Sequence, residues 1–200
     1  MKSRKLNEKF FNRPTLAVAE ALLGKFLVHG LPRKSASGLR KSASREVAIM
    51  ITEVEAYDGF NDLGSHASRG KTPRNAPMFG EPGCWYVYFT YGMHWMLNVV
   101  TREADYPAAV LFRGGAFVNK KGKLIEINGP AKLTKFLKVD GKFSGLPAST
   151  KTGLWIEDRG VAVQKKKIRR GSRIGIDYAG KYWARKPWRF FIGEKGEKSA

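Results

Sequence analysis

The sequence predicts a single mixed α/β domain of the α+β type, in which helices surround a curved, mostly antiparallel β-sheet. Its 200 residues suit one domain with a substantial core. Short apolar runs that alternate with polar residues recur along the chain, and few segments show a helical period. No stretch has the composition of a domain linker. We therefore expect residues 1–200 to form one domain, with flexible tails at 1–10 and 194–200.

Local periodicity predicts the individual elements. Leu16, Ala19 and Leu22 recur at helical spacing, so a helix is predicted over residues 12–23, ended by Gly24. A second helix is predicted to start at Pro130 and to run to residue 137. Strands are predicted over residues 25–29, 46–57, 84–90, 94–101, 108–113, 154–157 and 173–176.

Two stretches are predicted to be loops, and one pair of strands is predicted to be a hairpin. Arg-Lys-Ser-Ala-Ser occurs at 33–37 and again at 40–44, within a basic, polar stretch. This stretch is either an arm that contacts phosphates or a solvated loop. Residues 59–80 show little regular pattern, and a loop of that length is more often functional than a spacer. The predicted strands 84–90 and 94–101 form a protruding hairpin with Tyr91 at its tip.

The charge balance points to a polyanionic partner. The chain carries 37 Lys and Arg against 17 Asp and Glu, a formal net charge of +20. Nucleic acid is the leading candidate, and the alternative is a generic basic protein such as a ribosomal component.

The remaining composition bounds the cellular setting. The single Cys84 excludes an intramolecular disulfide and a multi-cysteine zinc site, and a reducing compartment fits. The sequence has no apolar run long enough to span a membrane and no signal-peptide core. We therefore expect an intracellular monomer without membrane contact, located in the bacterial cytoplasm or, in a eukaryote, in the nucleus.

Residues 51–98 carry the candidate chemistry. Glu53 and Glu55 lie two apart on a predicted strand, so their side chains share one face. Carboxylates in an apolar run are costly unless they are used or paired. One of them could be a general base with a raised pKa, or both could form salt bridges with basic neighbours.

Aromatic and histidine side chains follow closely. Aromatic faces stack nucleobases, and strand geometry puts Tyr86 and Tyr88 on the same side of the hairpin. Core packing is the alternative for some of these rings, most plausibly Trp85 or Trp95. A metal site that combined Glu55 with histidines would lack metal-ligand spacing. The aromatic and histidine residues are Tyr57, His66, Trp85, Tyr86, Tyr88, Tyr91, His94 and Trp95.

A series of motifs then stands in order along nearly the whole chain. They are Glu53-Val54-Glu55-Ala56-Tyr57, His66, Lys71-Thr72-Pro73-Arg74-Asn75, Met78-Phe79, Tyr86-Val87-Tyr88, Tyr91-Gly92-Met93, Asn98, Ala109-Val110-Leu111-Phe112-Arg113, Gly129-Pro130-Ala131-Lys132-Leu133, Arg173-Ile174-Gly175-Ile176 and Trp183-Ala184-Arg185-Lys186-Pro187. In these motifs the chain resembles the alkyladenine (3-methyladenine, methylpurine) DNA glycosylase family.

The resemblance implies a base-excision-repair enzyme that acts on double-stranded DNA without metal or organic cofactor. Such an enzyme flips a damaged purine out of the duplex and hydrolyses its N-glycosidic bond. Because no lysine stands out as a Schiff-base nucleophile, we predict that it does not cleave the strand. The implied lesions are 3-methyladenine, 7-methylguanine, hypoxanthine and ethenoadenine. By position, Glu55 would be the general base. Arg113 would help to hold the attacking water, together with a backbone carbonyl near Ile174.

The resemblance also implies the base-binding residues. Tyr57 and Tyr88 would sandwich the flipped base, His66 would complete the pocket, and Asn98 would help to exclude guanine. Tyr91, at the tip of the hairpin, would insert into the DNA. Glu53 would be structural. Further DNA contacts are expected from Met93, His94, Arg74 and Lys132.

Physical chemistry agrees with this reading, although two other classes remain open. Alkylated purines are often cationic, and aromatic faces attract cations. Unstacking a damaged base also costs less than unstacking a normal one. A non-catalytic basic nucleic-acid-binding module would show the same charge and aromatic content. A metal-dependent nuclease that used the carboxylates and histidines is the third alternative.

Overall fold

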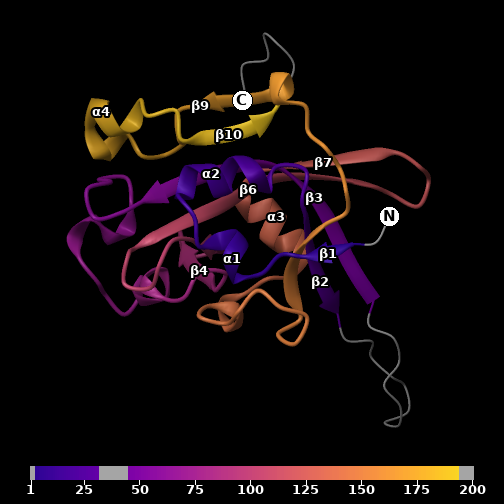
Figure 1. The fold of residues 1–200 in the computed structure, drawn as a ribbon, viewed down its shortest axis with the longest axis horizontal. Coiled ribbons are helices and arrows are strands. Elements are labelled where there is room, and N and C mark those ends of the chain that lie inside the picture. Colours follow the sequence, from indigo (N-terminus) through magenta and orange to yellow (C-terminus); the bar gives the residue numbers. More distant parts are fainter. Residues whose placement is uncertain (1–2, 32–44, 194–200) are drawn as a thin grey trace.

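The computed structural model describes residues 3–31 and 45–193, and it confirms the predicted α+β class. In the described part of the chain, one curved antiparallel sheet has the strand order β1-β8-β2-β3-β6-β5-β4 (Figure 1). Two further strands, β7 and β10, pair with β6 and β3, and β9 pairs with β10. The predicted repeat at 33–44 and the predicted tail at 194–200 lie outside the described residues.

Two long strands form the middle of the sheet, and both change partners along their length. β3 (Arg45–Asp58) pairs with β2 (Phe26–Leu31) over its first half and with β10 (Arg189–Ile192) over its second half. Its other edge pairs with β6 (Ala108–Val118). β6 pairs in turn with β5 (His94–Val100) and β7 (Leu124–Asn128).

Short helices pack on this sheet. α2 (Thr15–Leu22) lies against β3 and β6, and α3 (Pro130–Leu137) lies against β5 and β6. The predicted apolar stripe of α2 is in the core, where Leu22 is fully buried. Burial of such a side chain stabilises the fold by about 1.5–3 kcal/mol. Trp85 is also fully buried, so core packing is the correct interpretation for that ring.

The hairpin predicted around Tyr91 is confirmed. β4 (Trp85–Thr90) and β5 pair antiparallel from Trp85↔Val99 to Thr90↔His94. Tyr91 has φ = 51° and Gly92 has φ = 67°, so both tip residues adopt the left-handed conformation that tight hairpin turns require. The Tyr91 side chain is 82% exposed, which leaves it free to contact a partner.

The first and last described segments contain short elements that the sequence pattern did not predict. The expected flexible segment at 1–10 contains β1 (Arg4–Lys5), which pairs with β8 (Leu154–Asp158), and the start of α1 (Glu8–Phe11). α4 (Gly180–Ala184) lies beside β9 (Ile168–Gly171) and β10 at the upper edge of Figure 1. Short 3-10 helices add turns at His66–Arg69, Ala76–Phe79, Gly141–Phe143, Lys165–Lys167 and Asp177–Ala179.

The predicted strand at 173–176 is wrong. These residues bend rather than pair, and Gly175 has φ = 76°. Arg173 and Ile176, which are three residues apart, are buried by side-chain contacts, whereas Ile174 is 42% exposed, so the alternation in the sequence does not match the burial. The strands β7, β9 and β10 were not predicted, and β6 extends five residues beyond its predicted end at 113, to Val118.

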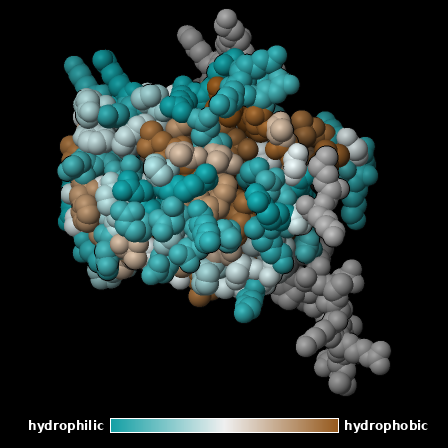
Figure 2. Space-filling view, in the orientation of Figure 1, coloured by the Kyte–Doolittle hydropathy of each residue, from teal (hydrophilic) through white to brown (hydrophobic). Residues whose placement is uncertain are grey.

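Most of the surface in Figure 2 is hydrophilic, with some apolar surface near the level of β7 and β10.

Candidate active site

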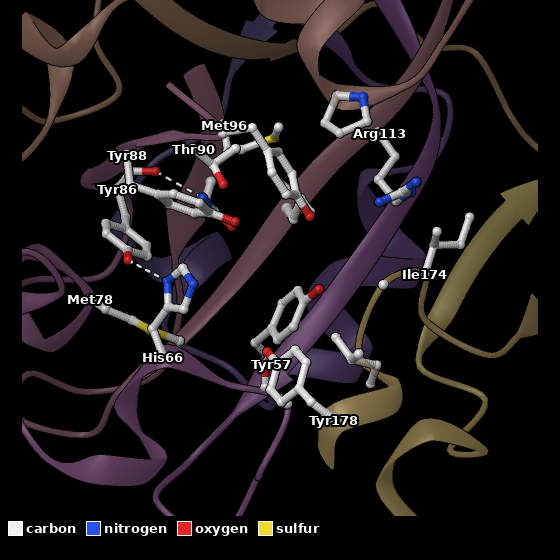
Figure 3. A pocket seen from close by; sticks show the side chains of 17 residues that line it. Tyr57, His66, Met78, Tyr86, Tyr88, Thr90, Met96, Arg113, Ile174 and Tyr178 are labelled. Atoms are coloured by element: carbon white, nitrogen blue, oxygen red, sulfur yellow. Dashed lines mark hydrogen bonds between the residues drawn. The ribbon is translucent and has the colours of Figure 1, made fainter. Parts of the chain in front are cut away.

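A cavity of about 340 Å³ opens where β3, β4, β5 and β6 meet the loops that follow them. Figure 3 shows side chains from these strands and from residues 174–178 pointing into it. Six residues predicted for the site line the cavity: Tyr57, His66, Tyr88, Tyr91, Asn98 and Arg113. The other lining residues are Gly64, Met78, Tyr86, Thr90, Met96, Leu111, Pro130, Ile174, Gly175, Ile176 and Tyr178.

Glu55 is fully buried immediately behind the lining residues. It lies in the half of β3 that pairs with β6 on one side and with β10 on the other. Its Oε2 accepts a hydrogen bond from the Tyr57 hydroxyl at 2.9 Å, and its Oε1 accepts one from the Ile174 backbone N–H at 2.8 Å. Arg113 Nε lies 3.4 Å from the same Oε1. Tyr57 and Arg113 both line the cavity, so the carboxylate adjoins it.

The surroundings of Glu55 suit a general base. Burial raises the pKa of its carboxyl group, and Arg113, the Ile174 N–H and the Tyr57 hydroxyl partly offset that effect. A carboxylate has about four lone-pair positions. Oε1 faces two donors and Oε2 faces one, so Oε2 has a lone-pair position that these donors do not use. A carboxylate with a raised pKa is also a stronger base than an ordinary one.

Glu53 shares its face of β3 with Glu55, as the two-residue spacing predicts. Arg113 Nε lies 3.3 Å from Glu53 Oε1, and Arg189 Nη1 donates to the same oxygen at 3.1 Å. The pairing of β3 with β6 shifts register on either side of Glu53. Such bulges are frequent next to active sites because they re-aim side chains. Glu53 therefore helps to hold Arg113 beside Glu55.

Aromatic side chains form two facing walls. Tyr57 lies on one side of the cavity, and His66, Tyr86 and Tyr88 lie on the other (Figure 3). The rings of His66 and Tyr88 meet edge to face, with centroids 4.6 Å apart. Burial raises the pKa of Tyr88 to about 12 and raises the pKa of Tyr57 well above its usual value. Both hydroxyls are therefore protonated near neutral pH.

His66 is held in place by two neighbours. Its Nδ1 shares a 2.8 Å hydrogen bond with the Tyr86 hydroxyl, and its carbonyl oxygen accepts from Asn75 Nδ2 at 2.9 Å. Burial and the nearby Arg74 lower the pKa of His66. The ring is therefore neutral near pH 7 and can lie against a flat substrate without a charge of its own.

Asn98 lines the cavity from β5. It is 3% exposed, and its Nδ2 donates to the Tyr86 carbonyl oxygen at 3.0 Å across the β4–β5 ladder. This bond fixes the amide plane.

The further residues predicted to contact DNA do not line the cavity. Met93 is 68% exposed near the hairpin tip, and His94 is half-buried at the start of β5. Arg74 donates to the Phe89 carbonyl oxygen at 2.9 Å and lies 5.4 Å from the Tyr88 ring centroid. Lys132 is exposed on α3.

Sequence reasoning missed three residues at the site. Tyr178 lines the cavity and donates to the Gly64 carbonyl oxygen at 3.1 Å. Asp62 and Arg173 form a fully buried ion pair behind Tyr57. Asp62 had no local signal because its partner is 111 residues away. Arg173 did stand within a quoted motif.

Within 3–31 and 45–193, no three His, Cys, Asp or Glu side chains lie close enough together to hold a metal ion. None of the helices in those ranges is long and apolar enough to span a membrane.

A buried acid beside an aromatic-walled cavity, in a strongly basic chain, is the arrangement expected of an enzyme that acts on a nucleobase. Comparison with known proteins agrees. Residues 9–196 match the family described as Methylpurine-DNA glycosylase (MPG). A protein of Methanocella arvoryzae named "Putative 3-methyladenine DNA glycosylase" is 44% identical over 197 residues, which cover 93% of this chain and 91% of that protein.

Two further relatives carry the same name. The protein of Frankia casuarinae is 39% identical and covers 92% of this chain and 86% of its own length. The protein of Streptomyces avermitilis is 38% identical and covers 94% of this chain and 87% of its own length. The chain therefore belongs to the methylpurine-DNA glycosylase family, which confirms the resemblance seen in its motifs.

Proposed function

We propose that this protein releases damaged purines from double-stranded DNA by hydrolysis of the N-glycosidic bond. The observation that carries the proposal is the position of Glu55, a fully buried carboxylate that adjoins an aromatic cavity through Tyr57 and Arg113. A protein that only binds nucleic acid has no need of such an acid, because burial of a carboxylate is costly. Family membership supports the same reaction.

In the proposed reaction, Glu55 takes a proton from a water molecule through Oε2, the oxygen with a lone pair to spare. Arg113 helps to hold that water, together with a backbone carbonyl near Ile174. The water oxygen attacks C1′ of the deoxyribose as the bond from C1′ to the purine nitrogen breaks. The purine leaves with the bonding electrons, and the DNA retains an abasic site. The proton on Glu55 passes to the purine when a neutral lesion leaves as an anion, and to solvent when a cationic lesion leaves neutral. The proposed enzyme is monofunctional: it does not cleave the strand.

The base has to leave the helix to reach Glu55. We propose that it stacks between Tyr57 on one wall and Tyr88 with His66 on the other. The backbone N–H of His66 would contact the purine edge. Asn98, fixed by the Tyr86 carbonyl oxygen, would exclude the 2-amino group of normal guanine. Tyr91, exposed at the hairpin tip, would fill the space that the flipped nucleotide leaves.

The proposed substrates are 3-methyladenine, 7-methylguanine, hypoxanthine and ethenoadenine. Alkylation at N3 or N7 makes the base cationic, and electron-rich rings on both walls attract a cation. The net charge of +20 supports affinity for the DNA backbone that is independent of sequence and falls with salt. Met93, His94, Arg74 and Lys132 are proposed to contribute to this contact. The protein would act as a monomer wherever the cell keeps its DNA, in bacterial cytoplasm or in a nucleus.

Glu55→Gln tests the proposal directly. We expect single-turnover release of hypoxanthine from a lesion duplex to fall by roughly 10²–10⁴, the usual contribution of a general base. Affinity for the same duplex should stay within a few-fold of wild type.

Glu157→Gln is the matched control. Glu157 is also a buried glutamate that accepts from an aromatic side chain, Trp155 Nε1 at 2.9 Å, and from an arginine, Arg159 Nε at 2.6 Å. It does not line the cavity, so the control should release base at the wild-type rate. Undiminished release of hypoxanthine by Glu55→Gln would show that Glu55 is not the general base. Binding without release by the wild-type protein, across all four lesions, would favour a non-catalytic module.

A further inference from the structure

The ion pair between Arg173 and Asp62 has no solvent contact. Both side chains are 0% exposed. Arg173 Nη1 lies 2.5 Å from Asp62 Oδ2, and Nη2 lies 2.7 Å from Oδ1. Two parallel hydrogen bonds of this kind fix the guanidinium plane as well as its position. Because a buried pair does not by itself stabilise a fold, its other contacts indicate what it does.

The carboxylate of Asp62 also accepts hydrogen bonds from nearby backbone N–H groups. Its Oδ2 accepts from the Asp58 N–H at 3.2 Å, and its Oδ1 accepts from the Gly64 N–H at 3.0 Å. Gly64 lines the cavity, and Asp58 ends β3. The carboxylate therefore ties the loop after β3 to the arginine.

Arg173 also contacts the backbone of β3, the strand that carries the proposed general base Glu55. Its Nη1 donates to the Ala56 carbonyl oxygen at 3.0 Å, and the Ala56 N–H donates to the Trp188 carbonyl oxygen at 2.8 Å. Ala56 is the residue between Glu55 and Tyr57. Both of its backbone groups are thus fixed, which constrains the side chains on either side of it.

The guanidinium lies close to two aromatic rings. It is 4.7 Å from the Tyr57 ring centroid and 5.0 Å from the Trp188 ring centroid. Tyr57 therefore has a cation packed against its ring in addition to the hydrogen bond from its hydroxyl to Glu55. The next residue after Arg173 is Ile174, whose N–H donates to Glu55 Oε1 at 2.8 Å.

We propose that Arg173 is a positioning residue of the active site. Held in place by Asp62, it fixes the positions of both Glu55 and Tyr57. It contacts Tyr57 through its side chain and reaches Glu55 through the N–H that follows it. The inference rests on the proposed function, since it concerns the base and the stacking wall assigned there.

Two variants disturb the guanidinium site and keep a positive charge at position 173. Arg173→Lys loses the paired hydrogen bonds. Gly64→Ala displaces the guanidinium by steric contact, because a Cβ at Gly64 would come within 2.8 Å of Arg173 Nη2 and 3.0 Å of Ile176 Cδ1. The matched control is Arg170→Lys, since Arg170 also pairs with a carboxylate, Glu20, and lies 4.8 Å from the Phe190 ring centroid without lining the cavity.

The readout is the pH profile of single-turnover base release, with hypoxanthine and 7-methylguanine duplexes as probes. Glu55 is faced by Arg113 from β6, by Glu53 and Tyr57 from β3, by Tyr88 from β4, and by the Ile174 N–H. Of these, only the contacts of Tyr57 and Ile174 depend on Arg173. Loss of either donor leaves Glu55 protonated at higher pH, so the acid limb of the profile should move to higher pH.

In both variants we also expect the plateau rate to fall by roughly ten- to hundredfold, whereas Arg170→Lys should retain the wild-type profile. A lower melting temperature with an unmoved acid limb in either folded variant would show a purely structural role and overturn the proposal. The wild-type protein separates the two hypotheses. No release by wild type overturns the proposed function, and the inference with it; active wild type with unshifted variants overturns the inference alone.

Discussion

The Tyr57 hydroxyl donates a 2.9 Å hydrogen bond to Oε2 of Glu55, so a residue of one cavity wall is hydrogen-bonded to the proposed general base. The same side chain thus has two separable parts. Its ring can stack a substrate, and its hydroxyl stabilises the ionised carboxylate, which lowers the pKa of Glu55.

Tyr57→Phe should separate those two parts. The ring remains, so affinity for a lesion duplex should change by less than about threefold. Without the hydroxyl, the pKa of Glu55 rises, less of it is ionised at a given pH, and the acid limb of the rate profile moves to higher pH. Single-turnover release measured from pH 4.5 to 8.5 would show this. An unchanged limb together with weakened binding would contradict it.

Glu55→Gln should make the protein more stable at alkaline pH. The folded-state pKa of Glu55 is raised above its unfolded value, so its contribution to stability is present at low pH and is lost as pH rises through the folded pKa. Glutamine has no such loss. A gain of about 1 kcal/mol would raise Tm by about 2–4 °C in a chain of this size.

Thermal unfolding of wild type and Glu55→Gln at pH 4 and pH 8 checks this. The advantage of the variant should be larger at pH 8 and small at pH 4. An advantage that is equal at both values, or reversed, would show that ionisation of Glu55 is not its source.

Asn75→Ala should loosen the wall that carries His66. The Asn75 side chain donates to the carbonyl oxygens of His66 and Gly70 and accepts from the Thr72 N–H. Loss of these bonds leaves buried polar groups unpaired, at a cost of about 1–3 kcal/mol. We expect weaker lesion binding and faster proteolysis between residues 66 and 79. Equal proteolysis rates in variant and wild type would argue against this role for Asn75.

Tyr91→Ala should affect flipping without affecting folding. Tyr91 is 82% exposed, so its removal should change stability by less than about 0.5 kcal/mol. Loss of one stacking contact, worth roughly 1–3 kcal/mol, should reduce the population of flipped base by about fivefold or more. A fluorescent base analogue next to the lesion reports this population.

Tyr182→Ala is the comparison for that experiment, because Tyr182 is 68% exposed on α4 and does not line the cavity. Equal effects of the two substitutions on fluorescence would show that Tyr91 has no specific role in base flipping.

Local pattern was sufficient for the middle of the fold. The apolar alternation that leads into Glu55 predicted β3, and the aromatic runs around Tyr91 predicted the hairpin. The order of the motifs brought together six residues that line one cavity. These features depend on neighbours in sequence, or on a resemblance that spans the chain.

The features that were missed depend on long-range contacts. β10 contains a buried arginine, Arg189, whose partner Glu53 lies 136 residues earlier, so local pattern did not predict a strand in this segment. Arg173 alternated like a strand residue although Asp62, and not a ladder, holds it. A periodicity window cannot contain both members of either pair.

The exchange of partners along β3 has a consequence for biosynthesis. The half of β3 that carries Glu55 pairs with β10, and Arg189 lies opposite Glu55 in that pairing. A nascent chain that ends before β10 therefore contains every residue that lines the cavity but lacks one of the two strands that pair with the Glu55 half of β3. Such long-range pairing forms late. If the proposed reaction is correct, an unfinished copy of this protein is unable to excise bases from the genome.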